Sequence, residues 1–252
     1  MRRLLPDVRD ETPAGVYDDL VLAGPVGGRS GVSLGMVSSV DGGATVDGRT
    51  ADLGGEADQA AFGALRAASD AILVGAGTVL AEDYGPAAGS TARRRRRLEK
   101  GLAASPRLVI VSNRLGMDPA ARVFGDPDRP PLLVTSRQGA SARPEVAARG
   151  EVLICGEQRV DLGEALRGLA ARGLGRVLCE GGPGLNASLF ARDLVDELFL
   201  TLAPTLVGGD APRIIAPLAE HTPRPLELLG LREHAGELLL HYRIRRPPAD
   251  RL

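Results

Sequence analysis

Seven short runs of apolar residues, rich in Val, Ile and Leu, alternate with segments of helical pattern along this chain. Several runs are apolar throughout, which is typical of strands covered on both faces. The runs occupy residues 31–40, 71–77, 107–112, 131–136, 151–156, 176–182 and 197–208. Strands that alternate with helices predict an α/β domain with a largely parallel sheet.

The segments between and after the runs complete this pattern. Residues 161–175 form the clearest amphipathic helix, and residues 56–69 and 184–195 are predicted as two more. The inward positions expected for the first helix are Leu162, Ala165, Leu166 and Leu169. The tail reads as two strands joined by a turn at Ala235 and Gly236, which predicts an antiparallel hairpin that closes one edge of the sheet.

Composition and charge exclude several classes of function. The 252 residues are 44% hydrophobic and carry a formal net charge of -1, so no overall field attracts nucleic acid or an anionic membrane. No run approaches the roughly 20 apolar residues of a membrane span. Cys155 and Cys179 lie in apolar runs without CxxC spacing, so we expect buried, reduced thiols in a cytoplasmic protein and no metal site.

No linker divides the chain, so we expect a single domain. The predicted boundaries are an N-terminal extension over residues 1–29, one domain over residues 30–246 and a tail over residues 247–252. The five consecutive arginines at 93–97 are expected on a solvated excursion or a short surface helix, although one or two of them could face a phosphate.

The stretch CEGGPGLN places Glu180 at the tip of a strand, and three glycines and a proline follow before a helix begins. Ligands of open α/β sheets bind outside the carboxyl ends of the strands. Glycines there leave backbone N–H groups accessible, and the helix N-terminus adds its positive dipole end, so the turn could bind phosphate oxygens. A tight turn without a ligand is an equally good interpretation of this stretch alone.

Two other glycine turns follow strands. In GAGTVLAED, at residues 75–83, Leu80 holds the third glycine position of the dinucleotide fingerprint, and Thr78 could cap a helix or contact a ligand. In MVSSVDGGATVDG, at residues 36–48, the pattern fits either a hairpin or one wall of a nucleotide cleft. No signature of a hydrolase or a zinc deaminase is present, and the three histidines lack partners at useful spacing, so the site suits a cofactor that carries a hydride.

The ordered motifs MVSSVDG, ILVGAGTVLAEDYGP, LVIVS, LLVTS, CEGGPGLNASLF and VDELFLTLAPTLVGG resemble the pyrimidine reductase family of riboflavin biosynthesis over roughly residues 30–245. The resemblance implies a dihydrofolate-reductase-like three-layer α/β fold, with a mostly parallel mixed sheet and the antiparallel hairpin at its C-terminal end. It also implies an NADPH-dependent oxidoreductase that reduces a ribosylamino-pyrimidine 5′-phosphate, either the uracil or the diaminopyrimidine form.

The resemblance also implies roles for particular residues. Glu180 would lie beside the substrate as the catalytic residue. Arg114 is our own addition for the 2′-phosphate of the cofactor, with a surface turn as the alternative. The expected cofactor-binding set is Ser38, Gly75, Thr78, Glu82, Ser112, Arg114, Gly181, Gly182, Pro183, Gly184, Leu185 and Asn186.

Some residues depart from the family pattern. Gly35 stands where relatives often have Lys or another polar residue, GGEAD at residues 54–58 replaces a Ser-containing stretch, and no deaminase domain is expected. These departures leave a dihydrofolate or pterin reductase, or an NADPH-binding module without turnover, as alternatives. Relatives are commonly dimers, so we expect a homodimer, with an edge strand near ELFLTLAP as a candidate interface.

Overall fold

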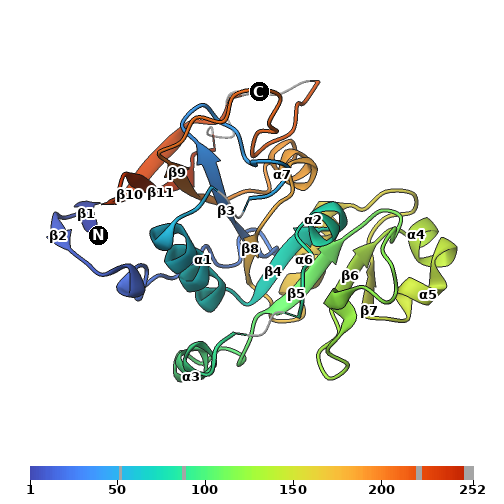
Figure 1. The fold of residues 1–252 in the computed structure, drawn as a ribbon. Helices are drawn as coiled ribbons and strands as arrows, with labels where there is room; N and C mark the ends of the chain where they lie inside the picture. Colours follow the sequence, from blue (N-terminus) through green and yellow to red (C-terminus); the bar gives the residue numbers. More distant parts are fainter. Residues whose placement is uncertain (51–52, 87–88, 220–222, 247–252) are drawn as a thin grey trace.

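A single mixed sheet of eleven strands runs through the whole molecule, in a computed structural model that describes all residues except 51–52, 87–88, 220–222 and 247–252 (Figure 1). The strand order is β2-β1-β10-β11-β9-β3-β8-β4-β5-β6-β7. The strands are β1 (Arg2–Leu5), β2 (Arg9–Asp10), β3 (Gly31–Ser39), β4 (Ala71–Gly75), β5 (Arg107–Val111), β6 (Leu132–Thr135), β7 (Glu151–Ile154), β8 (Arg176–Cys179), β9 (Glu197–Ala203), β10 (Leu226–His234) and β11 (Glu237–Ile244).

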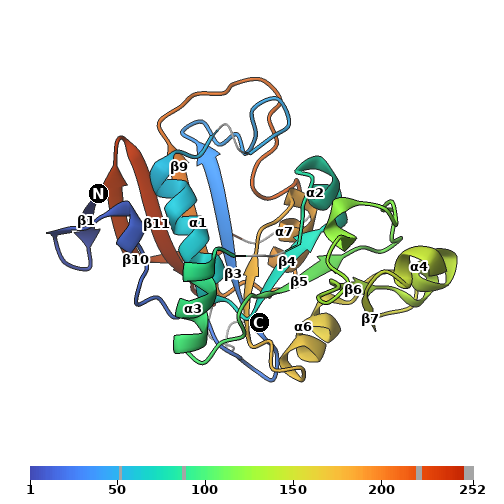
Figure 2. The ribbon, with the colours of Figure 1, turned by 60° about the horizontal axis from the view of Figure 1, so that its bottom comes forward.

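Helices cover both faces of the sheet, as the alternating pattern predicted (Figures 1 and 2). They are η1 (Pro13–Gly15), α1 (Glu56–Ala68), α2 (Ala76–Ala81), α3 (Thr91–Glu99), η2 (Arg122–Phe124), α4 (Arg137–Ala142), α5 (Pro144–Ala147), α6 (Leu162–Ala170) and α7 (Pro183–Phe190). Side chains alternate across β4: Leu73 packs in the cluster under α6 and α7, whereas Ile72 packs in the opposite cluster with Val79 of α2. This arrangement is the predicted three-layer α/β fold.

The parallel strands follow the apolar runs of the sequence closely. β3 pairs in parallel with β8 and β9, and β4 to β7 continue the parallel order on the other side of β8. The four inward positions expected for α6 are buried. Cys155 and Cys179 are free and buried, and burial is the main reason why the pKa of Cys179 rises to about 12.

The hairpin forms as predicted, because β10 and β11 pair antiparallel from His234 and Glu237 outwards around the expected turn. It does not form the edge of the sheet, since β1 pairs with β10 on the outside and β2 pairs with β1. Residues 1–29 therefore contribute two strands to the sheet, which the sequence did not indicate. The expected edge strand near ELFLTLAP is also wrong, because β9 lies inside the sheet between β11 and β3.

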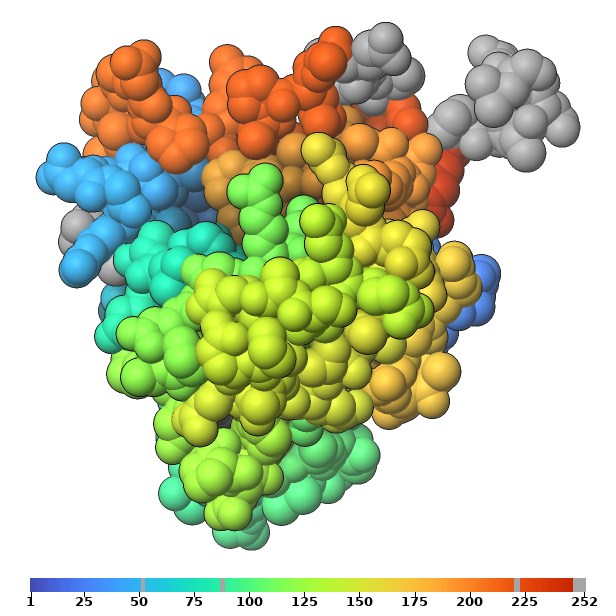
Figure 3. Space-filling view, turned by 90° about the vertical axis from the view of Figure 1, so that its right-hand side faces the viewer, coloured from blue at the N-terminus to red at the C-terminus, as the bar shows by residue number. Residues whose placement is uncertain are grey.

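The loops that follow β3 and β9 lie side by side at one end of the molecule (Figure 3). The backbone N–H of Ala44 donates to the carbonyl of Pro212 at 2.8 Å. Asp41 fastens the two loops, because its carboxylate accepts hydrogen bonds from Ser39 and from the N–H groups of Val207 and Gly208, which lower its pKa to about 2.

The arginine run forms α3, as one of the two expectations had it. The arginines were expected to be exposed to solvent, but one of them is not: Arg97 is only 2% exposed. In the part of the chain that the structure describes, no helix has the length and apolar character needed to span a bilayer. The same residues include no group of three metal-ligating side chains.

Candidate active site

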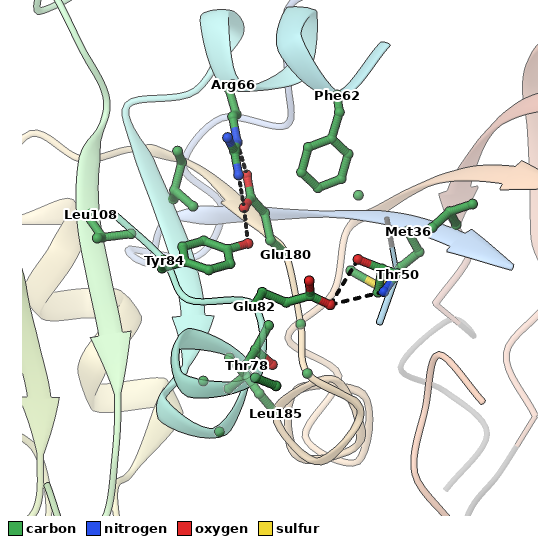
Figure 4. A pocket seen from close by; sticks show the side chains of 18 of the residues that line it. Met36, Thr50, Phe62, Arg66, Thr78, Glu82, Tyr84, Leu108, Glu180 and Leu185 are labelled. Atoms are coloured by element: carbon green, nitrogen blue, oxygen red, sulfur yellow. Dashed lines mark hydrogen bonds and ion pairs between the residues drawn. The ribbon is translucent and has the colours of Figure 1, made fainter. Parts of the chain in front are cut away.

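A cleft of about 850 Å³ opens on the face of the sheet that α1 and α2 cover (Figure 4). Its floor is formed by β3, β4 and the turn after β8, and α1 and α3 close the end that is remote from α7. A cavity of this size is typical of sites that enclose a cofactor and a substrate.

Most of the predicted site residues line this cleft. They are Gly75, Thr78, Glu82, Glu180, Gly181, Gly182, Pro183, Gly184, Leu185 and Asn186. The structure places the remaining three elsewhere: Ser38 is buried near the end of β3, Ser112 follows β5, and Arg114 is exposed in the turn after it. None of these three lines the cleft.

The glycine turn after β8 packs tightly against the start of α2. The N–H of Gly75 donates to the carbonyl of Gly181 at 2.8 Å, and the peptide bond between Gly181 and Gly182 is cis. A Cβ atom at Gly182 would lie 2.5 Å from Oγ1 of Thr78, so a side chain at this position cannot be accommodated without movement. The two glycine turns of the sequence thus form one contiguous backbone surface.

The N-terminus of α7 faces the cleft without a side-chain cap, because Gly182 is its N-cap residue. A Cβ atom at Gly184 would have no heavy atom within 4 Å, so the backbone next to this helix end remains open to the cleft. An uncapped helix N-terminus with accessible backbone fits an anion such as a pyrophosphate.

The Asn186 side chain, in contrast, is bonded within the protein. Its Nδ2 donates to the carbonyl of Ile214 at 2.7 Å, and its Oδ1 accepts from Sγ of Cys179 at 3.5 Å. Asn186 is 1% exposed and ties the loop after β9 to the glycine turn. Its contribution to a ligand site is therefore through its position in α7 rather than through its amide.

Glu180 is held from two sides. Nε and Nη2 of Arg66 bind its two carboxylate oxygens at 2.6 Å and 2.7 Å, and the hydroxyl of Tyr84 donates to Oε2 at 2.6 Å (Figure 4). The Glu180 side chain is 0% exposed, whereas that of Arg66 is 40% exposed. The charged group that this arrangement offers to a ligand is thus the guanidinium of Arg66, oriented by Glu180.

The pKa shifts agree with this network. Burial lowers the pKa of Arg66, but the hydrogen bond and charge of Glu180 outweigh burial and raise it. Burial and the negative charge of Glu180 both raise the pKa of Tyr84 above its usual range. Tyr84 therefore remains a protonated hydroxyl that donates to the carboxylate.

Glu82 lies at the C-terminal end of α2 and also has partners within the protein. Its Oε1 accepts from the N–H and the hydroxyl of Thr50 at 3.0 Å and 3.1 Å. These bonds hold the loop after β3 over the cleft, where Figure 4 shows Thr50 opposite Glu82. The Glu82 side chain thus reaches this loop.

The sequence did not single out Arg66, Tyr84 or Phe62, although all three line the cleft. A signal for two of them was present: Phe62 and Arg66 are four residues apart, so they share a helix face that differs from the buried face of Ala61 and Leu65. No local pattern marks Tyr84, which follows α2 in an irregular segment.

Comparisons with known proteins identify the family to which this chain belongs. The model of the RibD C-terminal domain family matches residues 31–240. The chain is 37% identical over 151 residues to a 2,5-diamino-6-ribosylamino-4(3H)-pyrimidinone 5′-phosphate reductase of Archaeoglobus fulgidus, covering 60% of this chain and 69% of the relative. It is 33% identical over 178 residues to the Methanothermobacter thermautotrophicus protein of the same name, covering 68% of this chain and 79% of that protein.

Solved structures share the fold. A pyrimidine reductase-like protein of Corynebacterium diphtheriae superposes with a TM-score of 0.80 at 25% identity, covering 94% of this chain and all of the other. The riboflavin biosynthesis reductase of Saccharomyces cerevisiae gives a TM-score of 0.62 at 19% identity, covering 87% of this chain and 92% of the other. With the family model matching most of its length, this chain belongs to the RibD C-terminal domain family, the pyrimidine reductases of riboflavin biosynthesis.

Proposed function

We propose that the protein is a cytoplasmic, NADPH-dependent reductase that transfers a hydride to C1′ of a ribosylamino-pyrimidine 5′-phosphate. The observation that carries the proposal is one cleft that joins an open glycine turn at a helix N-terminus to an arginine fixed by a buried glutamate. The printed names of the two archaeal relatives describe reductases of such a phosphate. Membership of an oxidoreductase family supports the reaction class.

The glycine turn is the proposed site of the cofactor pyrophosphate. The backbone from Gly181 to Gly184 and the N-terminus of α7 supply N–H groups and positive dipole character, and Thr78 lies beside them. Ser112 and Arg114 follow β5, the neighbour of β4, so they remain our proposal for the adenosine end of an extended dinucleotide.

The proposed reaction balances with one proton. When bound, NADPH supplies a hydride to C1′; the bond between C1′ and the ring oxygen O4′ breaks, O4′ takes a proton, and the products are a ribitylamino group and NADP⁺. The chain itself contributes chiefly position, because holding two reacting carbons in near-contact lowers the entropic barrier.

Glu180 serves this proposal as a positioning residue. Its carboxylate has no exposed surface and accepts from Arg66 and Tyr84, so it acts through them rather than on the substrate. Arg66 then faces the acceptor with a fixed guanidinium plane, a geometry suited to oxygen groups.

The test is NADPH oxidation, followed by the loss of its near-ultraviolet band after rapid mixing with the ribosylamino-pyrimidine phosphate. We expect saturable oxidation that depends on the pyrimidine and yields the ribitylamino compound, identified by mass. If the protein oxidises NADPH in the presence of none of the pyrimidine or pterin acceptors, the proposal is contradicted. Tight NADPH binding without turnover would instead identify a nucleotide-binding module.

A pterin or dihydrofolate is the second candidate acceptor, because the acceptor side is more apolar than expected. A Cβ atom at Gly35 would lie 3.1 Å from Leu178 and 3.5 Å from Phe62, so this position is enclosed by apolar side chains. The Phe62 ring and Met36 beside this position suit a flat heterocycle (Figure 4). Parallel assays with dihydrofolate and with the pyrimidine, at equal concentration, separate the two acceptors.

We also propose a homodimer, joined through one face of the sheet rather than through an edge. Strand pairing places Leu202 opposite Leu238 and Leu200 opposite Leu240, and Leu240 also pairs with Leu231. These leucines are half-buried on the face opposite α1, which is the helix that packs on this part of the described sheet. At the border of these leucines, strand pairing places Arg2 opposite Glu233. In a two-fold interface the same patch of both protomers meets, so the positive side chain of one can face the negative side chain of the other.

Replacing Leu240 with glutamate should abolish the dimer, because it buries a charge at the centre of the apolar face. Light scattering coupled to gel filtration should give twice the chain mass for the wild type and the chain mass for Leu240→Glu. Val21→Glu is the matched control, since Val21 is 70% exposed away from this face and its variant should remain dimeric. A wild-type monomer at high concentration would refute the interface.

A further inference from the structure

Helix α3 brings two arginines to the end of the cleft remote from α7. Arg93 and Arg97 are four residues apart, so they share one face of the helix, and both line the cleft. Figure 2 shows α3 next to α1, and Ser90 caps α3 by accepting from the N–H of Arg93 at 3.3 Å. The arginine run thus contributes a wall of the site.

Arg97 fastens α3 to the end of α1. Its Nη1 donates to the carbonyls of Arg66, Ala67 and Ser69 at 2.9, 3.1 and 2.6 Å, and its Nε donates to Ala103 at 2.8 Å. Nη2 has no hydrogen-bond partner in the described part of the chain. Arg97, a residue that is 2% exposed, therefore lines the cleft with a guanidinium that is hydrogen-bonded to carbonyls and to no carboxylate.

The charge of Arg97 is offset only in part by a nearby carboxylate, Asp70, to which it is not hydrogen-bonded. Burial lowers the pKa of Arg97 most, the negative charge of Asp70 raises it, and the positive charges of Arg129 and Arg176 lower it, which together bring it to about 10. At neutral pH the group stays protonated, so this end of the cleft carries a buried positive charge. An anionic ligand is the partner that would balance it.

Arg93 extends the same positive region to the mouth. Its side chain is exposed and makes no hydrogen bond or ion pair with any described residue. Its guanidinium lies against the backbone of α1 at Gly63, where a Cβ atom would come within 2.2 Å of Nη2. Glycine inside a helix costs about 0.5–1 kcal/mol, and here its missing side chain makes room for Arg93.

A small pocket of about 100 Å³ continues from this end of the cleft and is also basic. The two hollows share Pro86, Ser105, Pro106 and Leu108 in their walls. Beyond these shared residues, the pocket is lined by three arginines, one acid and two apolar residues: Arg94, Arg107, Arg129, Asp126, Val123 and Pro131. Several arginines, rather than one, thus give this end of the cleft a positive electrostatic potential.

We propose that Arg93, backed by the buried Arg97, binds the terminal oxyanion of the acceptor, a phosphate or a carboxylate, and so selects acceptors with an anionic tail. The inference rests on the proposed reductase function for the acceptor's identity, and it names the end of the cleft at which the acceptor's tail lies. The cofactor pyrophosphate lies at the other end, beside α7, so the two anions do not compete.

Arg93→Gln is the primary test, with Arg95→Gln as its matched control. Arg95 is on the same helix but is 83% exposed at its side chain and pairs with Glu99. For the phosphorylated pyrimidine, we expect Arg93→Gln to raise KM about 10–100-fold, from the loss of a charged hydrogen bond, with the KM for NADPH unchanged. With the dephosphorylated pyrimidine, Arg93→Gln and wild type should have equal KM values.

Gly63→Ala tests the same site without removing a charge. Its methyl group displaces the Arg93 guanidinium, so KM for the phosphorylated acceptor should rise while the melting temperature is maintained or raised. To test whether the site binds a carboxylate, dihydrofolate is compared with a dihydropterin that lacks the carboxylate-bearing tail. An Arg93 effect confined to the phosphate identifies a phosphate site, and one confined to dihydrofolate identifies a carboxylate site.

A binding measurement separates this inference from the proposed function. Calorimetric titration of inorganic phosphate into the NADPH-saturated protein should give saturable heat for wild type and Arg95→Gln, and none for Arg93→Gln. This result supports the site even if no acceptor is reduced. Equal phosphate binding by wild type and Arg93→Gln, or an unchanged KM for every anionic acceptor, overturns the inference.

Discussion

Replacing Arg66 with methionine is expected to lower the free energy of unfolding by about 3 kcal/mol and to reduce turnover by at least about 100-fold. The variant leaves the carboxylate of Glu180, which has no exposed side-chain surface, without its charged partner. Tyr84 still donates one hydrogen bond, which places the loss of stability at the low end of the range for broken buried ion pairs. Denaturant unfolding and steady-state kinetics measure the two effects.

A double variant separates stability from chemistry in this network. Arg66→Met with Glu180→Gln removes both charges, so it should regain part of the lost stability and none of the lost turnover. Arg95→Met is the control for removing an arginine, because its pair with Glu99 is exposed and should change stability by less than about 1 kcal/mol. If Arg66→Met and Arg95→Met have the same free energy of unfolding, the stabilising role given to the pair of Arg66 and Glu180 is contradicted.

Replacing Gly182 with alanine should weaken NADPH binding by about 100-fold, because a displaced turn loses a hydrogen bond from its backbone to the charged pyrophosphate, worth about 1.5–3 kcal/mol. The new Cβ atom would lie 2.5 Å from Oγ1 of Thr78, so the turn must move away from α2. The φ angle of Gly182 is -76°, which alanine adopts freely, so the effect is steric rather than conformational. Fluorescence titration with NADPH measures the change.

Thr78→Ala provides the internal control for this contact. Removing Oγ1 leaves the next Thr78 atom, Cβ, 3.9 Å from the new methyl group. The double variant Gly182→Ala with Thr78→Ala should therefore bind NADPH more tightly than Gly182→Ala alone, and close to Thr78→Ala. Purely additive losses would show that the contact between turn and helix does not set the geometry of the site.

The sequence predicted the parts of this protein that local pattern determines. The parallel strands, α6 and the hairpin turn at Ala235 follow from apolar runs, helical spacing and turn residues. The glycine turn after β8 was found because glycines between a strand and a helix are a local signal. The resemblance to a family then supplied the order in which these parts assemble.

Long-range contacts explain what the sequence could not indicate. Arg66 and Tyr84 meet Glu180 across 114 and 96 residues of chain, so no spacing in the sequence joins them. β1 is only four residues long and begins with two arginines, which hides its pairing with β10. The interior place of β9 depends on how β11 returns alongside it, and apolar content alone does not distinguish an inner strand from an edge.

The most direct measurement of the central claim is deuterium transfer from NADPH labelled at C4 on one face. The account predicts that the ribitylamino product contains one deuterium, at C1′, for one of the two labelled faces and none for the other, because the cleft fixes the nicotinamide relative to Arg66 and Glu180. A product that takes its new hydrogen from solvent, or that carries label equally from both faces, would contradict direct hydride transfer in this cleft.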